Sequence, residues 1–263
     1  MRVVFELIES GQSRIEVMRV ERLSLPRDFV TPGPTLMFIP GFTGRLRLAQ
    51  FVESLLKPEP IFYFLPDACP VFFERITTAT DVLFISLLEP SNFGKALPLE
   101  IKRSTEPGIN HNLLTVIDDL FHHSAGNPSS THIHEMLIDK ISSIFELQNP
   151  LGKAKEPYRN AMQLFERLRI GLDFDVDIGE VCQELKVHIS QASREFRRTF
   201  GLPPYRFWLL LRLARSRQGL IQQSSATEVA HKYGFADQSH FIRSFRRFHL
   251  RTPTQYQVEI KQR

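Results

Sequence analysis

The sequence predicts a two-domain α+β chain in which a small antiparallel β-barrel or sandwich precedes an all-helical domain. Short apolar runs that end at Pro or Gly dominate residues 1–100, which is typical of antiparallel strands. Helical apolar periodicity dominates the C-terminal part instead. The 263 residues are 42% hydrophobic and 24% charged. This ordinary globular composition excludes collagen-like, low-complexity and wholly disordered chains.

The charge is divided unevenly between the two parts. Residues 1–150 carry 13 basic and 18 acidic side chains, a net charge of −5, whereas residues 151–263 carry 20 and 11, a net charge of +9. This asymmetry indicates a basic module that meets a polyanion, attached to a mildly acidic module with another role. A solvated basic surface is the alternative. The Pro-, Gly- and Lys-containing segment 149–157 is typical of a linker, so we expect domains at 1–150 and 157–263.

The first domain is expected to contain strands at its apolar runs Leu36–Ile39, Ile61–Leu65 and Asp81–Leu88. One segment has helical spacing instead and predicts a helix near 46–57; its apolar residues are Leu48, Phe51, Val52, Leu55 and Leu56. Two further amphipathic helices fall within 109–148. They are too short to stand alone and must pack against the barrel, each other or a second chain, so we expect a possible homodimer contact through this segment.

The sequence contains no motif typical of catalysis or of metal binding. GxSxG, GxGxxG and GxxxxGK[ST] are absent. The first histidine is His111, and His132 and His134 point to different faces of a helix rather than sharing one as in HExxH. Cys69 and Cys182 form no CxxC pair, which argues against a disulfide framework or a zinc site. We expect no catalytic residue, no metal site and no cofactor, and we interpret Cys182 as a buried filler between crossing helices.

We also expect no membrane segment. The apolar stretch Phe207–Leu211 is far shorter than the roughly 20 residues that a transmembrane helix needs. The first residues carry early acidic side chains and too short an apolar run for a secretory signal. A cytoplasmic setting is therefore predicted.

The C-terminal domain contains an internal repeat. Residues 196–207 align with residues 245–256 at an offset of 49, and the offset falls to 48 before the turn, so the second copy has one additional turn residue. Equivalent pairs are Ser190 and Ser239, Arg194 and Arg243, and Val181-Cys182 and Val229-Ala230.

Each copy is typical of two short helices joined by a tight turn. In the first copy, Asp177 and Glu180 have the spacing of a capping box, and Gly201 is placed to end the second helix. In the second copy, Ser225 and Glu228 repeat the capping box. The chain therefore contains a duplicated helix-turn-helix pattern.

The outward face of the second helix in each copy carries side chains suited to DNA. Arg can bond guanine bidentately, Gln can bond adenine, and Ser can donate or accept. Because the same Arg recurs in both copies, we favour DNA contact over a merely solvated face. The predicted base-contacting residues are Ser190, Ser193, Arg194, Gln238, Ser239, His240 and Arg243. The predicted phosphate-contacting residues are Arg197, Arg198, Arg246 and Arg247.

Residues 203–222 read as one helix between the two copies, with Leu209, Leu210, Leu213 and Leu220 facing inward. Roughly 20 residues at about 1.5 Å each give a connecting helix about 30 Å long. Successive major grooves on one face of B-DNA are about 34 Å apart. This connecting helix can therefore hold the second helices of the two copies about one DNA turn apart within a single chain.

The run GFADQSHFIRSFRRF at 234–248, followed by Thr252-Pro253, resembles the signature of AraC/XylS-type bacterial transcription regulators, and the resemblance covers about residues 157–260. It implies an all-helical DNA-binding domain, promoter binding, and usually activation through contacts with RNA polymerase. It also implies a cupin-like barrel with dimerising helices in the first half. Three positions depart from the family pattern: His188 replaces Ser, Ala192 replaces Leu, and Leu250 replaces Gly.

We therefore predict a non-enzymatic, sequence-specific activator in the cytoplasm, associated with the nucleoid, whose domain 1–150 senses a small molecule or dimerises. One alternative gives the same DNA-binding domain to an N-terminal enzyme, as in DNA-repair methyltransferase fusions. Those enzymes need a metal-bound Cys cluster that Cys69 alone cannot supply. The other alternative gives control to a protein partner, such as a chaperone or an anti-activator.

Overall fold

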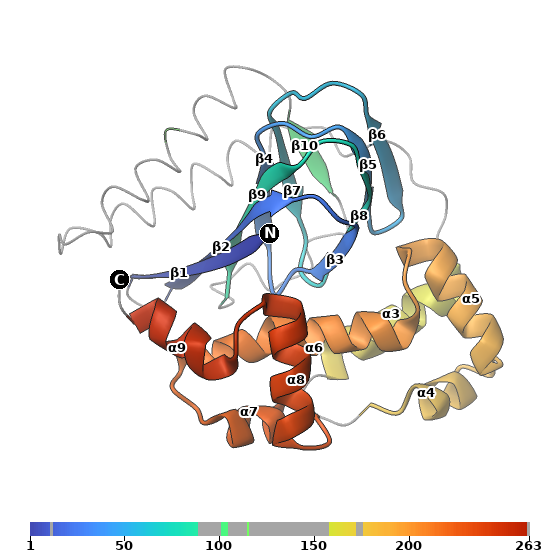
Figure 1. Cartoon of the computed structure of the whole chain (residues 1–263). Coiled ribbons are helices and arrows are strands. Elements are labelled where there is room, and N and C mark those ends of the chain that lie inside the picture. Colours follow the sequence, from blue (N-terminus) through green and yellow to red (C-terminus); the bar gives the residue numbers. More distant parts are fainter. Residues whose placement is uncertain (11–12, 89–100, 105–114, 116–157, 172–175, 262–263) are drawn as a thin grey trace.

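The computed structural model describes residues 1–10, 13–88, 101–104, 115, 158–171 and 176–261. A sheet-rich N-terminal domain lies against a C-terminal domain of helices (Figure 1). This arrangement confirms the predicted α+β two-domain fold. The predicted linker 149–157 and the predicted helix pair within 109–148 lie outside the described residues.

The described strands form two antiparallel sheets rather than one closed ring of pairings. The six-stranded sheet has the order β1-β2-β9-β4-β7-β10, and the four-stranded sheet has the order β3-β8-β5-β6. The strands are β1 (Arg2–Ser10), β2 (Ser13–Leu23), β3 (Arg27–Val30), β4 (Thr35–Ile39), β5 (Gly44–Leu48), β6 (Phe51–Leu55), β7 (Ile61–Leu65), β8 (Pro70–Ile76), β9 (Thr80–Leu87) and β10 (Lys102–Ser104).

An aromatic cluster joins the two sheets. Phe29 of β3 packs against Phe73 of β8 in its own sheet, with ring centroids 6.2 Å apart. It also packs against Phe84 of β9 in the other sheet, at 5.1 Å. The sandwich therefore has one continuous apolar interior, as expected for two sheets that face each other.

The three predicted strands are confirmed as β4, β7 and β9, but the predicted helix near 46–57 is wrong. That segment is the hairpin of β5 and β6, in which Leu48 pairs with Phe51. Leu46, Leu48 and Leu55 are buried, whereas Leu56 is 87% exposed. Buried and more exposed side chains alternate along β5, which is the two-residue period of a strand. Pairing with β8 supplies hydrogen-bond partners for the backbone N–H and C=O groups of β5. Local helical spacing was overridden by tertiary pairing.

The C-terminal domain contains seven described helices. They are α3 (Arg159–Ile170), α4 (Ile178–Glu184), α5 (Ile189–Phe200), α6 (Pro204–Ile221), α7 (Ala226–Lys232), α8 (Gln238–His249) and α9 (Pro253–Lys261). The predicted connecting helix is confirmed as α6. Its Leu209, Leu210, Leu213 and Leu220 are all buried, as predicted.

Helices α3 and α9 were not predicted from the sequence, although both complete the core. Phe165 of α3 stacks on Phe200 of α5 at 4.8 Å. Tyr256 of α9 is fully buried and packs edge-on against Phe5 of β1 at 5.0 Å. The apolar spacing of α3 at Ala161, Leu164, Phe165 and Leu168 was a usable signal for a helix.

Candidate nucleic-acid interface

The first helix-turn-helix unit consists of α4 and α5. The carboxylate of Asp177 accepts hydrogen bonds from the backbone N–H groups of Gly179 and Glu180, so it caps α4 as predicted. Gly201 ends α5 in the left-handed conformation with φ +84°, and its N–H donates to the carbonyl of Arg197. His188 caps the start of α5, because its Nδ1 accepts from the N–H of Ser190 at 3.3 Å. A histidine thus performs the capping role at this position.

The second unit consists of α7 and α8. Ser225 and Glu228 form the predicted capping box, with both reciprocal bonds present. Asp237 caps α8, since its carboxylate accepts from the N–H of His240 at 2.7 Å. Leu250 follows α8 with φ +56°, so the residue that replaces the family's Gly does adopt the left-handed conformation.

The two units share their turn geometry. The N–H of Val187 donates to the carbonyl of Cys182, and the equivalent N–H of Phe235 donates to the carbonyl of Ala230. The turn residue with positive φ is Lys186 in the first unit, at +54°, and Gly234 in the second, at +68°. Both Cys182 and Ala230 are buried, as expected for small residues at a helix crossing. Hydrogen bonding and burial thus support the repeat found in the sequence.

Most of the predicted DNA-contacting side chains are exposed on α5 and α8. Ser193 and His240 are the two partly buried ones, and the ring of His240 packs edge-on against Phe235 at 5.8 Å. The exposed ones are Ser190, Arg194, Arg197, Arg198, Gln238, Ser239, Arg243, Arg246 and Arg247. Their contacts with bases and phosphates remain predictions.

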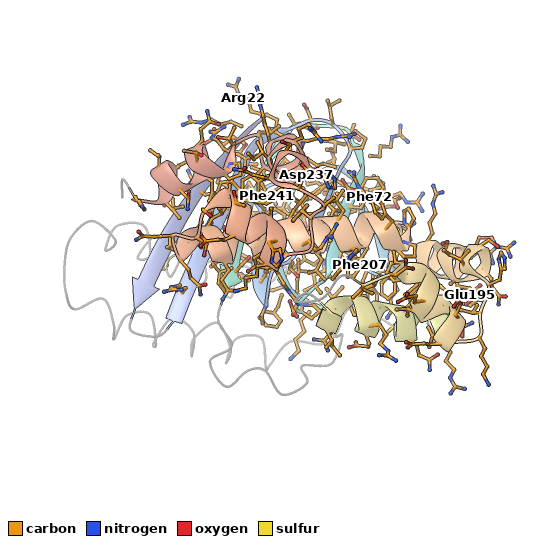
Figure 2. The ribbon with its side chains drawn as sticks, turned by 90° about the horizontal axis from the view of Figure 1, so that it is seen from below. Arg22, Phe72, Glu195, Phe207, Asp237 and Phe241 are labelled. Carbon is orange, nitrogen blue, oxygen red and sulfur yellow. The ribbon has the colours of Figure 1, made fainter. Side chains whose placement is uncertain are left out.

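A groove of about 830 Å³ separates the two units and brings Ser193 of α5 and His240 of α8 to one opening. Pro203, Tyr205 and Trp208, at the start of α6, form part of its lining. In the view from below, α8 with Asp237 and Phe241 lies beside the middle of α6, whereas α5 with Glu195 lies beyond one end (Figure 2). One base-contacting candidate from each unit therefore lines the same groove, and α6 supplies part of its surface.

Several arginines of the basic domain face inward rather than toward a nucleic acid. Arg206, Arg215 and Arg217 of α6 form ion pairs with Asp28, Asp67 and Glu16 of the N-terminal domain. Arg212 is 5% exposed, and its guanidinium carbon lies 5.3 Å from the ring centroid of Trp208 and 4.7 Å from that of Phe235. Part of the charge asymmetry therefore binds the two domains together. This role was not predicted from the sequence. Its signal was the presence of four arginines in a helix whose other residues are mostly apolar, because such arginines need acidic partners when they are buried.

Other chemistry is sparse among the described residues. No group of three or more His, Cys, Asp or Glu side chains within them could hold a metal ion. Burial raises the pKa of the Cys69 thiol, which disfavours the reactive thiolate. No helix in the described part of the chain is long and apolar enough to cross a membrane.

Two helix-turn-helix units on one connecting helix define a bipartite DNA-binding domain. Residues 181–258 match a protein family described as a helix-turn-helix domain. The HTH-type transcriptional regulator ArgR of Pseudomonas aeruginosa is 30% identical over 125 residues, which are 45% of this chain and 37% of ArgR. GbdR of Pseudomonas aeruginosa, also an HTH-type transcriptional regulator, is 32% identical over 103 residues, 39% of this chain and 27% of GbdR. The matches span well under half of these relatives.

A similarity of fold extends over nearly the whole chain. A structure of ToxT from Vibrio cholerae with an unsaturated fatty acid bound covers 97% of this chain and 99% of its own, with a TM-score of 0.50 and 12% identity. ToxT therefore shares the order of a sheet-rich domain followed by a helical domain. Residues 181–258 therefore carry a helix-turn-helix domain, and the relatives that share this part of the chain are named HTH-type transcriptional regulators.

Proposed function

We propose that the protein is a sequence-specific transcription regulator in which residues 157–263 read two successive major grooves. The observation that best supports this proposal is the duplicated helix-turn-helix unit, in which Arg194 and Arg243 are exposed at equivalent positions. In addition, Ser193 and His240 line one groove. The 18 residues of α6 are about 27 Å long, against about 34 Å between successive major grooves, so the connecting helix has a length on the scale of one DNA turn. Seven side chains would read bases and four arginines would contact phosphates, as predicted from the sequence.

Residues 1–150 are proposed to regulate the DNA-binding domain and to contribute a dimer contact through 109–148. Activation through RNA polymerase and a cytoplasmic, nucleoid-associated location follow from the same proposal. No enzymatic step is assigned to this domain, since its buried Cys69 is a poor nucleophile.

Selection of bound fragments from a random DNA pool by the full-length protein tests the reading of two grooves. We call α5 the first recognition helix and α8 the second. The expected result is a motif with two elements centred about 10 base pairs apart, because each recognition helix reads one groove. A motif with a single element would contradict reading by both units. Absence of any enriched motif would overturn the proposed function.

The effector of residues 1–150 is either a small molecule or a protein partner. ToxT is described with an unsaturated fatty acid bound, so its fold admits the first. Native mass spectrometry of the purified full-length protein separates the two: a retained small molecule supports ligand sensing. Its absence, combined with co-purification of a defined protein, supports partner control.

A further inference from the structure

The short strand β3 (Arg27–Val30) contacts the end of the second recognition helix directly. Arg27 donates from Nη2 to the carbonyl oxygen of Phe248, and the same nitrogen lies 3.4 Å from the carbonyl oxygen of Arg247. Carbonyls in the last turn of a helix have no partner within the helix. A cation at that end is also favoured by the helix dipole. Arg27 therefore supplies a charged cap to α8 from the other domain.

The next residue of the strand binds the connecting helix. Asp28 accepts two hydrogen bonds from Arg206 of α6, at 2.8 Å from Nε and 3.0 Å from Nη2. The guanidinium of Arg206 also lies over the ring of Phe248, 4.4 Å from its centroid. Such a two-bond pair fixes orientation as well as distance. Asp28 thus holds the same end of α8 through one intermediate side chain.

The third residue anchors the strand inside the sandwich. Phe29 packs against Phe73 and Phe84, at the cluster that joins the two sheets. One contiguous chain of contacts therefore runs from the interior of the N-terminal domain through β3 to the C-terminal end of α8. Figure 1 shows α8 reaching up to the N-terminal domain near β3.

The first recognition helix meets the same four-stranded sheet. A Cβ atom at Gly201, directly after α5, would lie only 2.2 Å from Cδ of Arg47 on β5. Arg47 is itself fixed by its ion pair with Glu74 of β8, at 2.5 Å. The C-terminal ends of both recognition helices thus abut arginines of one sheet, while their N-terminal ends, where the predicted base contacts begin, point away from it.

We propose that β3 is the element by which the N-terminal domain sets the position of the second recognition helix, with Arg27 and Asp28 as positioning residues for DNA reading. The proposal rests on the proposed function. A helix of 12 residues is about 18 Å long, so a tilt of about 10° at its held end moves the other end by about 3 Å. Base-reading side chains tolerate displacements of only about 0.5 Å. Loosening β3 is therefore expected to weaken specific binding.

Asp28→Asn separates positioning from plain electrostatics, because the two effects have opposite signs. Removing an acidic charge by itself strengthens binding to a polyanion. Weakening of the two-bond pair between Asp28 and Arg206 instead lowers the affinity for the selected motif, by about 3- to 30-fold. The measurement is fluorescence anisotropy of the full-length protein with the selected motif and with random DNA. Arg27→Met is the second variant and is expected to weaken specific binding similarly, with an unchanged salt slope, since Arg27 bonds helix carbonyls and not phosphate.

Arg2→Met is the matched control, since Arg2 lies on the outer strand β1 and pairs only loosely with Glu21, at 4.0 Å. Hydrogen exchange provides a readout that does not involve DNA. Amides in the last turn of α8 are expected to exchange faster in both β3 variants, and at the wild-type rate in Arg2→Met.

The outcomes are distinguishable. If the wild-type protein selects no motif, the proposed function fails, and the exchange rates alone then decide whether β3 holds α8. If the wild type selects a motif but Asp28→Asn binds it as tightly or more tightly, and α8 exchange is unchanged, the positioning role of β3 is overturned. Loss of the folded state would show as faster exchange throughout the chain, and Arg27→Met then provides the deciding comparison.

Discussion

Glu16 of β2 and Arg217 of α6 form a fully buried ion pair between the two domains. The carboxylate accepts from Nε at 2.7 Å and from Nη2 at 2.7 Å, and the side chains are 0% and 3% exposed. The hydroxyl of Tyr256 on α9 donates to the same carboxylate at 2.7 Å. The carboxylate has three donors from two helices, so the N-terminal domain is fixed to the helical domain at a buried site.

Glu16→Gln is expected to destabilise the protein by about 3–5 kcal/mol, because it leaves the Arg217 guanidinium buried without its counter-charge. Chemical denaturation of the full chain measures the change. The matched control is Glu21→Gln, whose partner Arg2 is 66% exposed and 4.0 Å away. A change below about 1 kcal/mol is expected there. Equal effects of the two variants would contradict a structural role for the buried pair.

Arg243→Ala and Arg194→Ala are each expected to lower affinity for the selected DNA motif by about 1–3 kcal/mol and to relax preference at one base pair, since a bidentate contact to guanine is lost. Binding is compared on the motif, on single-base variants of it and on random DNA. An equal loss on selected and random DNA would argue against base reading by these side chains.

Arg246→Ala is expected to weaken binding to all sequences alike. The dependence of log affinity on log salt should become shallower by about one unit, because one fewer counterion is released. Titrations at several salt concentrations on random DNA give this slope. A slope identical to that of the wild type would remove Arg246 from the phosphate-contacting set.

Lys186→Gly is expected to stabilise the first helix-turn-helix unit by about 0.5–1 kcal/mol. Lys186 is exposed and holds φ +54°, a conformation that glycine adopts without strain. Gly234→Ala, at the equivalent turn position, should destabilise instead. Its φ is +68°, and an added Cβ would lie 3.2 Å from Nη1 of Arg212. Thermal unfolding measures both; a destabilising Lys186→Gly would refute the strain argument.

His249 is expected to make the folded protein less stable in mild acid. Burial, together with the nearby Arg217 guanidinium, holds the pKa of His249 well below its usual range. The unfolded chain binds a proton below about pH 6.5 and the folded chain does not, so stability falls as pH drops through that value. Between pH 7.5 and 5.5 the loss should be about 1 kcal/mol.

His249→Gln should reduce this loss, whereas His231→Gln should leave it unchanged, because His231 is exposed on α7. Unfolding is followed at pH 7.5 and pH 5.5 in all three proteins. The same acid dependence in wild type and His249→Gln would show that other groups cause it.

The helical domain was largely predictable because its signals are local. The capping residues Asp177 and Ser225, the terminating Gly201 and the spacing of α6 each depend on neighbours within a few residues. Repetition of the pattern at a fixed offset made each unit support the other. Exposure of Arg194 and Arg243 followed from the helical period alone.

The hairpin of β5 and β6 and the interface between the domains depended on partners distant in sequence. Leu48 and Leu55 have helical spacing, and only pairing of β5 with β8 selects the strand. Glu16 and Arg217 are 201 residues apart, so nothing near either residue signals the other.

The sequence by itself determined the class of the C-terminal domain, its two units and the side chains that they expose. Helix caps, turns and periodicity act over a few residues, and composition reports charge directly. Tertiary structure alone decided which arginines of α6 bind the N-terminal domain, because a buried charge is stable only beside a counter-charge that the fold brings to it.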